Sequence, residues 1–175
     1  MGILIQGGRV VDAASQMDKI ADVYLDDGVI QEIGEKLKVK DKDDRIIDAR
    51  GMVVMPGLVD LHVHFRDPGQ TEKEDIESGS KAAARGGVTT VVAMPNTTPV
   101  IDCPDRANYV KNKAAQVSPI HVLQAGAMTK GELGCELSDI AGMAAAGVPV
   151  LSEDGKSVMK ASLCKQAMEE AVKAG

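Results

Sequence analysis

The sequence predicts an α/β protein in which a β-rich segment precedes parallel strands joined by crossover helices. Three observations support this class. Residues 1–55 alternate apolar and polar residues with period two, and turn signals separate the runs. From residue 56 onward, short apolar runs alternate with stretches of helical period. Clusters of polar and turn-forming residues follow each of these later apolar runs. We therefore expect two parts, residues 1–55 and 56–175.

The first part contains three alternating runs, ILIQGGRVVD, VYLDDGVIQEIG and IIDARGMVVM. Asp27-Gly28 interrupts the second run and is a strong signal for a two-residue hairpin turn. The stretch from Glu35 to Arg45 mixes both signs of charge, which is more typical of a solvated edge than of a binding patch. This part should therefore be all-β.

The second part contains four strand–helix units. The strands are expected near 59–65, 89–94, 120–126 and 148–151, and the helices near 72–85, 104–116, 137–145 and 158–174. Pro104 suits a first helical turn, and Gly86-Gly87 and Gly147 suit helix ends. HFRDPG, PNTTP, AMTKG and SEDG each follow a strand. Sites form at these strand ends in (β/α)8 barrels and in doubly wound sheets alike, so this placement does not choose between the two folds.

Composition excludes several functional classes. The 26 acidic residues outnumber the 20 basic ones, and only three aromatic residues are present, which argues against nucleic-acid binding. The first 15 residues carry neither a basic leader nor an apolar run long enough for a signal peptide or membrane span, so we expect a cytoplasmic protein without membrane contact. Cys103, Cys135 and Cys164 form no CxxC pair and are expected to be reduced and mostly buried.

His62 and His64 are the first candidate metal ligands. Residues two apart on a strand lie on the same face, so both imidazoles can bind one cation. Asp154, in SEDG at the end of the fourth strand, would add an oxygen ligand at the same rim; alone it would read as a turn or cap residue. Its neighbour Glu153 should point elsewhere. His121 lies early in the third strand and is expected to be a core or surface residue.

Two further residues suit an anionic substrate. Arg66 can hold a carboxylate with its planar guanidinium, although a salt bridge to Asp67 or Glu72 is the simpler alternative. Asn96 can offer its amide to the same group, although an Asn in a Pro-rich turn is commonly structural.

MPGLVDLHVHFRDPG, GVTTVVAMPNTTP and VLSEDG, in this order after a β-rich start, resemble the amidohydrolase superfamily and, within it, the bacterial-type (class I) dihydroorotases. The resemblance spans essentially the whole chain. It implies a (β/α)8 barrel, of which the first four βα units are present, behind a small β-rich sandwich segment.

The resemblance also implies chemistry. Zn²⁺, one or two ions per subunit, would be held by His62, His64 and Asp154, and the substrate by His64, Arg66 and Asn96. The reaction would interconvert N-carbamoyl-L-aspartate and dihydroorotate in pyrimidine biosynthesis. Relatives that act on hydantoins or dihydropyrimidines generally place a carboxylated Lys where Asp154 stands, so Asp154 favours dihydroorotase. A shifted register that brought Lys156 there would weaken this preference.

The family's remaining zinc ligands and its catalytic Asp lie in later strands, so no residue of these 175 is assigned that catalytic role, and these residues alone are expected to be inactive. Alternatives are another cyclic amidohydrolase, such as an allantoinase or hydantoinase, and a non-catalytic dihydroorotase-like subunit that scaffolds aspartate carbamoyltransferase. Expected partners are the small-molecule substrate, a second copy in a homodimer, or aspartate carbamoyltransferase.

Overall fold

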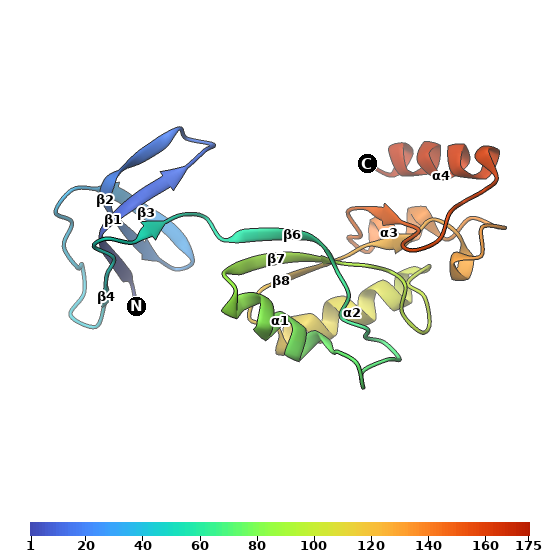
Figure 1. The fold of residues 1–175 in the computed structure, drawn as a ribbon, viewed down its shortest axis with the longest axis horizontal. Helices are drawn as coiled ribbons and strands as arrows, with labels where there is room; N and C mark the ends of the chain where they lie inside the picture. Colours follow the sequence, from blue (N-terminus) through green and yellow to red (C-terminus); the bar gives the residue numbers. More distant parts are fainter. The chain divides into compact units, whose positions relative to one another are not determined.

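A computed structural model describes all residues, 1–175, and divides the chain into two compact units, Met1–Pro56 and Gly57–Gly175 (Figure 1). The boundary falls at the Pro-Gly step after the last alternating run. Each unit has its own hydrophobic core. No helix combines the length and the apolar character that crossing a membrane would require.

The first unit is one five-stranded mixed sheet with the strand order β3-β2-β1-β4, in which β5 also pairs with β1. Its strands are β1 (Ile3–Asp12), β2 (Met17–Asp26), β3 (Val29–Gly34), β4 (Arg45–Asp48) and β5 (Val53–Val54). β1 pairs antiparallel with β2 and parallel with β4 and β5. All five strands join this single sheet, so the pairing alone does not divide them into the two layers expected for a sandwich segment.

The hairpin predicted at Asp27-Gly28 is confirmed. Asp26 pairs with Val29 across the turn, and both turn residues have positive φ, 50° and 73°. The charged stretch that follows is mostly exposed, as predicted, but Asp44 within it has a structural role. Its carboxylate accepts hydrogen bonds from the Gly2 amide at 2.7 Å and the Tyr24 hydroxyl at 2.8 Å.

The second unit alternates strands and helices, as predicted. Its elements are β6 (Leu58–Val63), α1 (Ile76–Arg85), β7 (Val88–Ala93), α2 (Pro104–Val117), β8 (His121–Gln124), β9 (Gly126–Ala127), the 3-10 turn η1 (Lys130–Glu132), α3 (Ile140–Ala145), β10 (Leu151–Ser152) and α4 (Ala161–Ala174). β6, β7 and β8 form a parallel sheet, and β9 pairs parallel with β10.

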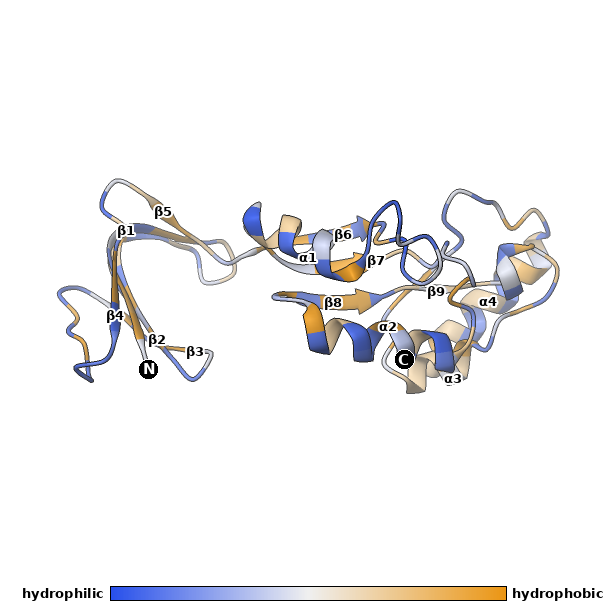
Figure 2. Ribbon diagram, turned by 90° about the horizontal axis from the view of Figure 1, so that it is seen from below, coloured by the Kyte–Doolittle hydropathy of each residue, from blue (hydrophilic) through white to orange (hydrophobic).

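Helices α1 and α2 lie on one face of the β6-β7-β8 sheet (Figure 1). Ile76 of α1, Val110 of α2 and Val91 of β7 are buried together in the core between them. α2 alternates hydrophobic and hydrophilic residues along its length, as a helix with one buried face does (Figure 2).

Several predicted boundaries are wrong for local reasons. α1 and α3 begin four and three residues later than predicted, because Asp75 and Asp139 cap them with side-chain hydrogen bonds. The fourth strand is Leu151–Ser152 rather than 148–151, since Pro149 has no amide hydrogen for a ladder. The predicted third strand divides into β8 and β9, where pairing passes from β7 to β10.

The cysteine prediction is also wrong in one respect. None of the three is buried: Cys103 and Cys164 are half-buried and Cys135 is exposed. They form no disulfide, as expected. Cys135 and Cys103 lie in or next to polar loops, where little apolar surface is available to cover them.

Candidate metal centre

The two histidines lie at the carboxyl end of β6. His62 is within the strand and His64 follows its last residue, so alternation directs both to the same side. Their ring centroids are 5.2 Å apart. The intervening Val63 and the following Phe65 take the opposite side and pack in the core beneath α1 and α2. The packing of Val63 and Phe65 in this core thus fixes the side on which the imidazoles project.

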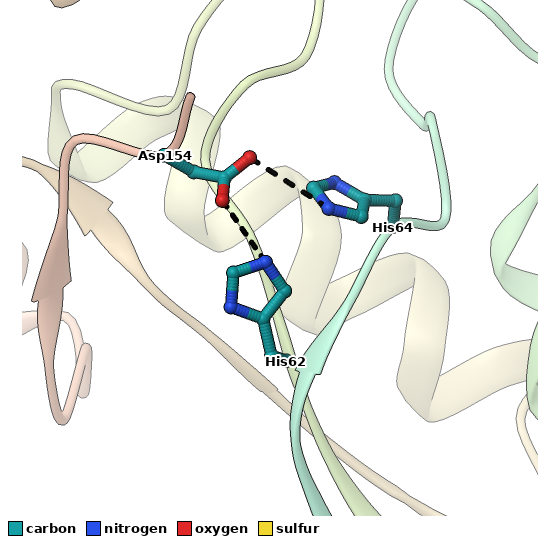
Figure 3. Close-up of side chains that lie close together, drawn as sticks. All are labelled: His62, His64 and Asp154. Atoms are coloured by element: carbon teal, nitrogen blue, oxygen red, sulfur yellow. Dashed lines mark ion pairs between the residues drawn. The ribbon is translucent and has the colours of Figure 1, made fainter. Parts of the chain in front are cut away.

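Asp154, in the turn after β10, lies against both rings (Figure 3). Its Oδ1 is 2.9 Å from His62 Nε2, and its Oδ2 is 3.6 Å from His64 Nε2. One donor atom from each residue lies within 4.8 Å of the others. The Asp154 side chain is 15% exposed whereas that of His62 is 57% exposed, so the group is open to solvent on the His62 side.

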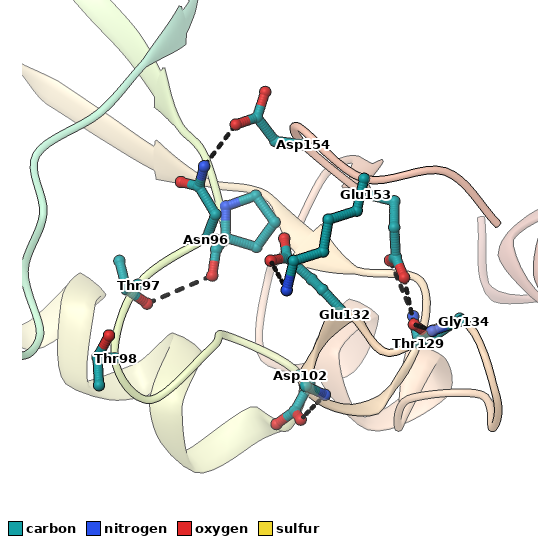
Figure 4. Close-up of polar contacts among 12 residues, drawn as sticks. Asn96, Thr97, Thr98, Asp102, Thr129, Glu132, Gly134, Glu153 and Asp154 are labelled. Atoms are coloured by element: carbon teal, nitrogen blue, oxygen red, sulfur yellow. Dashed lines mark hydrogen bonds and ion pairs between the residues drawn. The ribbon is translucent and has the colours of Figure 1, made fainter.

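Asn96, in the loop after β7, joins two members of this group. Its Nδ2 donates to Asp154 Oδ2 at 2.5 Å, and its Oδ1 is 3.0 Å from His64 Nδ1 (Figure 4). An ionised carboxylate only accepts hydrogen bonds, so the amide nitrogen must face Asp154 and the amide oxygen must face His64. His64 Nδ1 therefore carries the hydrogen, and in the neutral ring Nε2 presents its lone pair towards Asp154.

This arrangement suits a cation. In the neutral ring with its hydrogen on Nδ1, the lone pair of His64 Nε2 faces an Asp154 carboxylate oxygen at 3.6 Å. Two acceptors in this position repel, and a positive ion between them removes the repulsion. Two imidazole nitrogens and one carboxylate oxygen form a donor set that Zn²⁺ accepts, with room for further ligands.

Arg66 occupies an uncommon backbone conformation, with φ at 57°. Its half-buried side chain forms no ion pair, so neither Asp67 nor Glu72 neutralises it. Asp67 instead binds α2, where Lys113 Nζ is 2.5 Å and the Tyr109 hydroxyl 3.0 Å from its carboxylate. The loop is thus anchored next to Arg66, and the guanidinium remains free to bind an anion.

Glu153 points away from Asp154, as predicted, and is buried. Its Oε2 accepts hydrogen bonds from the amides of Met128 at 2.9 Å and Thr129 at 3.1 Å, and its Oε1 accepts one from the Thr129 hydroxyl. The carboxylate therefore holds the loop after β9, residues 128–134, which we call the third loop. Sequence reasoning missed this role, since nothing in SEDG distinguishes an acid that binds a loop from one that faces solvent.

Lys156 pairs with Glu132 of the third loop, Nζ to Oε2 at 3.7 Å. His121 is the first residue of β8 and is exposed, at the opposite end of the strand from the loops, as predicted. Neither residue joins the group around Asp154.

The family model and the sequence relatives agree on one family. A family model described as "Dihydro-orotase-like" matches residues 51–174. The chain is 52% identical over 169 residues to a dihydroorotase of Clostridioides difficile (strain 630), and 46% identical over 171 residues to one of Ruminiclostridium cellulolyticum. These alignments cover 97% and 98% of the chain but 40% of each relative, so the chain spans about two fifths of their length.

Solved structures give the fold. An L-hydantoinase from Arthrobacter aurescens superimposes with a TM-score of 0.81 over 98% of this chain and 38% of its own, at 24% identity. A D-hydantoinase from a Thermus species is 31% identical, with a TM-score of 0.60 over 71% of this chain and 27% of its own. The fold is therefore that of the corresponding part of hydantoinase-type amidohydrolases.

Proposed function

The chain belongs to the dihydro-orotase-like family, and from this premise we propose that the whole protein is a metal-dependent dihydroorotase. It would interconvert N-carbamoyl-L-aspartate and dihydroorotate, a step of pyrimidine biosynthesis. The observation that carries the proposal is the meeting of Asp154 with both imidazoles, at 2.9 and 3.6 Å.

The position of Lys156 supports this choice of reaction over a hydantoinase. A carboxylated Lys in place of Asp154 would have to reach the histidines, but Lys156 pairs with Glu132 instead. This supports the interpretation that Asp154 takes the place of the carboxylated Lys that the resemblance implies for hydantoin-cleaving relatives.

His62, His64 and Asp154 would hold Zn²⁺ together with ligands from outside these 175 residues. When bound, the ion would supply Lewis acidity, which polarises a carbonyl oxygen and lowers the pKa of water from 15.7 to about 7. Asn96 would keep His64 in the tautomer that offers Nε2, because its amide oxygen accepts the hydrogen on Nδ1. Its expected contact with the substrate remains a prediction, since both ends of its amide are already engaged.

Arg66 would orient the substrate. Its guanidinium is unpaired, lies two residues beyond His64, and offers two parallel N–H groups that match a carboxylate. Dihydroorotate carries an exocyclic carboxylate, whereas hydantoin and dihydrouracil carry none. Arg66 therefore favours binding of dihydroorotate over hydantoin and dihydrouracil.

The test is a substrate panel on the full-length protein. We expect hydrolysis of dihydroorotate at a kcat/KM at least 100-fold above that for hydantoin or dihydrouracil, about 3 kcal/mol in favour of the carboxylate. Arg66→Lys should lose most of this preference, because an ammonium cannot bind in the same fork. His62→Ala should lose both bound zinc and turnover. A faster reaction with hydantoin, or near-normal activity and zinc content in His62→Ala, would contradict the proposal.

A further inference from the structure

A cavity of about 590 Å³ lies beside the metal centre and shares two residues with it, Asn96 and Asp154. Its other walls combine apolar and polar residues. They include an amide, a hydroxyl pair, a carboxylate and an ammonium group, from Gln70, Thr97, Thr98, Glu132 and Lys156. None of these five is among the expected metal ligands.

Glu132 is the unusual member. Its side chain is 1% exposed, and its Oε1 has no hydrogen-bond partner. It extends from the third loop towards Asn96 (Figure 4). A buried carboxylate oxygen without a hydrogen-bond donor destabilises the folded protein. A ligand that donates a hydrogen bond to this oxygen would remove the destabilisation, and this would favour binding.

The third loop is held so that Glu132 cannot turn away easily. The Gly131 amide donates to Asp102 at 2.8 Å, and Glu153 binds the amide and hydroxyl of Thr129. Glu132 itself has φ at 53°, a conformation that side-chain-bearing residues seldom adopt. The carboxylate is therefore kept in the wall of the cavity by contacts of Thr129 and Gly131, which precede it in the third loop.

Lys156 determines what kind of group fits. Its ammonium is 3.7 Å from Glu132 Oε2, and its side chain is 51% exposed. The pair thus presents a free acceptor, Glu132 Oε1, next to a donor, Lys156 Nζ. The two charges balance, which disfavours a ligand group with a net charge of its own. A neutral group that carries N–H and C=O side by side, a carboxamide or a urea, matches both partners at once.

We propose that Glu132 and Lys156 form a subsite for the carbamoyl group of the substrate, with Glu132 Oε1 accepting a hydrogen bond from its terminal NH₂ and Lys156 donating to its oxygen. The assignment rests on the proposed function, which supplies a substrate with such a group. It makes Glu132 a specificity-determining residue, although no pattern in the sequence identified it.

The experiment compares two inhibitors in one assay. Initial rates of dihydroorotate hydrolysis by the zinc-loaded full-length protein are measured with added N-carbamoyl-L-aspartate or N-acetyl-L-aspartate. The two compounds differ only by NH₂ against CH₃, so a general loosening of the site weakens both alike. A hydrogen bond to a charged acceptor predicts at least about tenfold tighter inhibition by the carbamoyl compound.

Glu132→Leu should reduce this ratio to about twofold or less and leave inhibition by N-acetyl-L-aspartate unchanged. Glu132→Gln, which preserves the size of the side chain, should do the same. Lys156 can only donate hydrogen bonds, so the Gln amide oxygen would face Lys156 and the Gln NH₂ would face the NH₂ of the ligand, where two donors meet. Glu136→Gln is the matched control: Glu136 is an exposed acid of the same region, paired with Lys130, and its loss should not change the ratio. A variant without measurable hydrolysis is titrated with both compounds by calorimetry.

If the two compounds inhibit the wild-type protein about equally, or if the tenfold difference persists in both Glu132 variants, the proposed subsite is wrong. The proposed function would still be supported as long as the protein hydrolyses dihydroorotate. If the wild-type protein hydrolyses no dihydroorotate, the proposed function fails and the subsite fails with it. If Glu132→Leu does not fold, Glu132→Gln decides.

Discussion

Replacing Asn96 by Ala tests whether the metal centre is preorganised. The substitution removes a hydrogen bond to the carboxylate of Asp154 and one to His64 Nδ1. Bonds to charged groups contribute about 1.5–3 kcal/mol and neutral ones about 1 kcal/mol, so about 4 kcal/mol is the upper limit of the effect. A bound ion restores part of the geometry by itself. We therefore expect zinc affinity to fall about 10- to 100-fold, as it does when other partners of metal ligands are removed.

The assay is competition for zinc between the full-length protein and a chromophoric chelator. Asn108→Ala is the control, because it makes the same chemical change at an exposed position of α2. Its zinc affinity should match that of the wild type. Unchanged affinity in Asn96→Ala would show that the two hydrogen bonds do not orient the ligands, and the reasoning on the His64 tautomer would fail.

Three other predictions concern the loops that flank the metal centre and the sheet of the first unit. Lys113→Met removes the cation that pairs with the fully buried Asp67, so it should lower the free energy of unfolding, measured by urea titration, by about 3 kcal/mol. Lys165→Met removes one partner of an exposed ion pair and should change the free energy of unfolding by less than about 1 kcal/mol. Glu153→Ala should speed hydrogen exchange of the third-loop amides about tenfold or more, since a charged acceptor is lost. In the first unit, the pKa of Asp44 is lowered from 3.8 to about 2, chiefly by backbone hydrogen bonds, and that of Tyr24 is raised from 10.0 to about 12, chiefly by its hydrogen bond to Asp44. Thermal unfolding should therefore show that this unit loses stability as pH falls from about 4 to 2, because the Asp44 carboxylate is protonated there. It should lose stability again as pH rises from about 10 to 12, because the Tyr24 phenol ionises there. Tyr24→Phe should not show the loss of stability at alkaline pH.

The order of strands and helices could be read from the sequence because its signals are local. Apolar periodicity identifies the strands of the second unit, and Asp27-Gly28 identifies the hairpin of the first. Boundaries were less predictable. The acidic residues before α1 have helical propensity, but the chain becomes helical only where Asp75 binds the Ser78 amide and caps the helix. That choice depends on which side chain reaches the backbone, which periodicity does not record.

The two imidazoles were predictable for the same reason, because a spacing of two on a strand fixes their common side. The environment of Asp154 was less so. Nothing in SEDG or PNTTP indicates that Asn96 donates to a residue 58 positions later. The free Glu132 carboxylate was not predictable at all, because its burial depends on contacts of the third loop with Asp102 and Glu153.

Glu153 and Asp154 show why adjacent acids cannot exchange roles. One carboxylate is buried and holds the third loop, while the other lies against the histidines, so the backbone after β10 directs consecutive side chains to opposite sides. A slip of one residue would bring Glu153 towards the imidazoles and leave the third-loop amides without their acceptor. The same register holds the third loop that carries Glu132, so metal ligation and the proposed carbamoyl subsite depend on one turn of the chain. An insertion before Glu153 should therefore impair zinc binding and the preference for the carbamoyl compound together, whereas substitution of Glu132 should impair only the second.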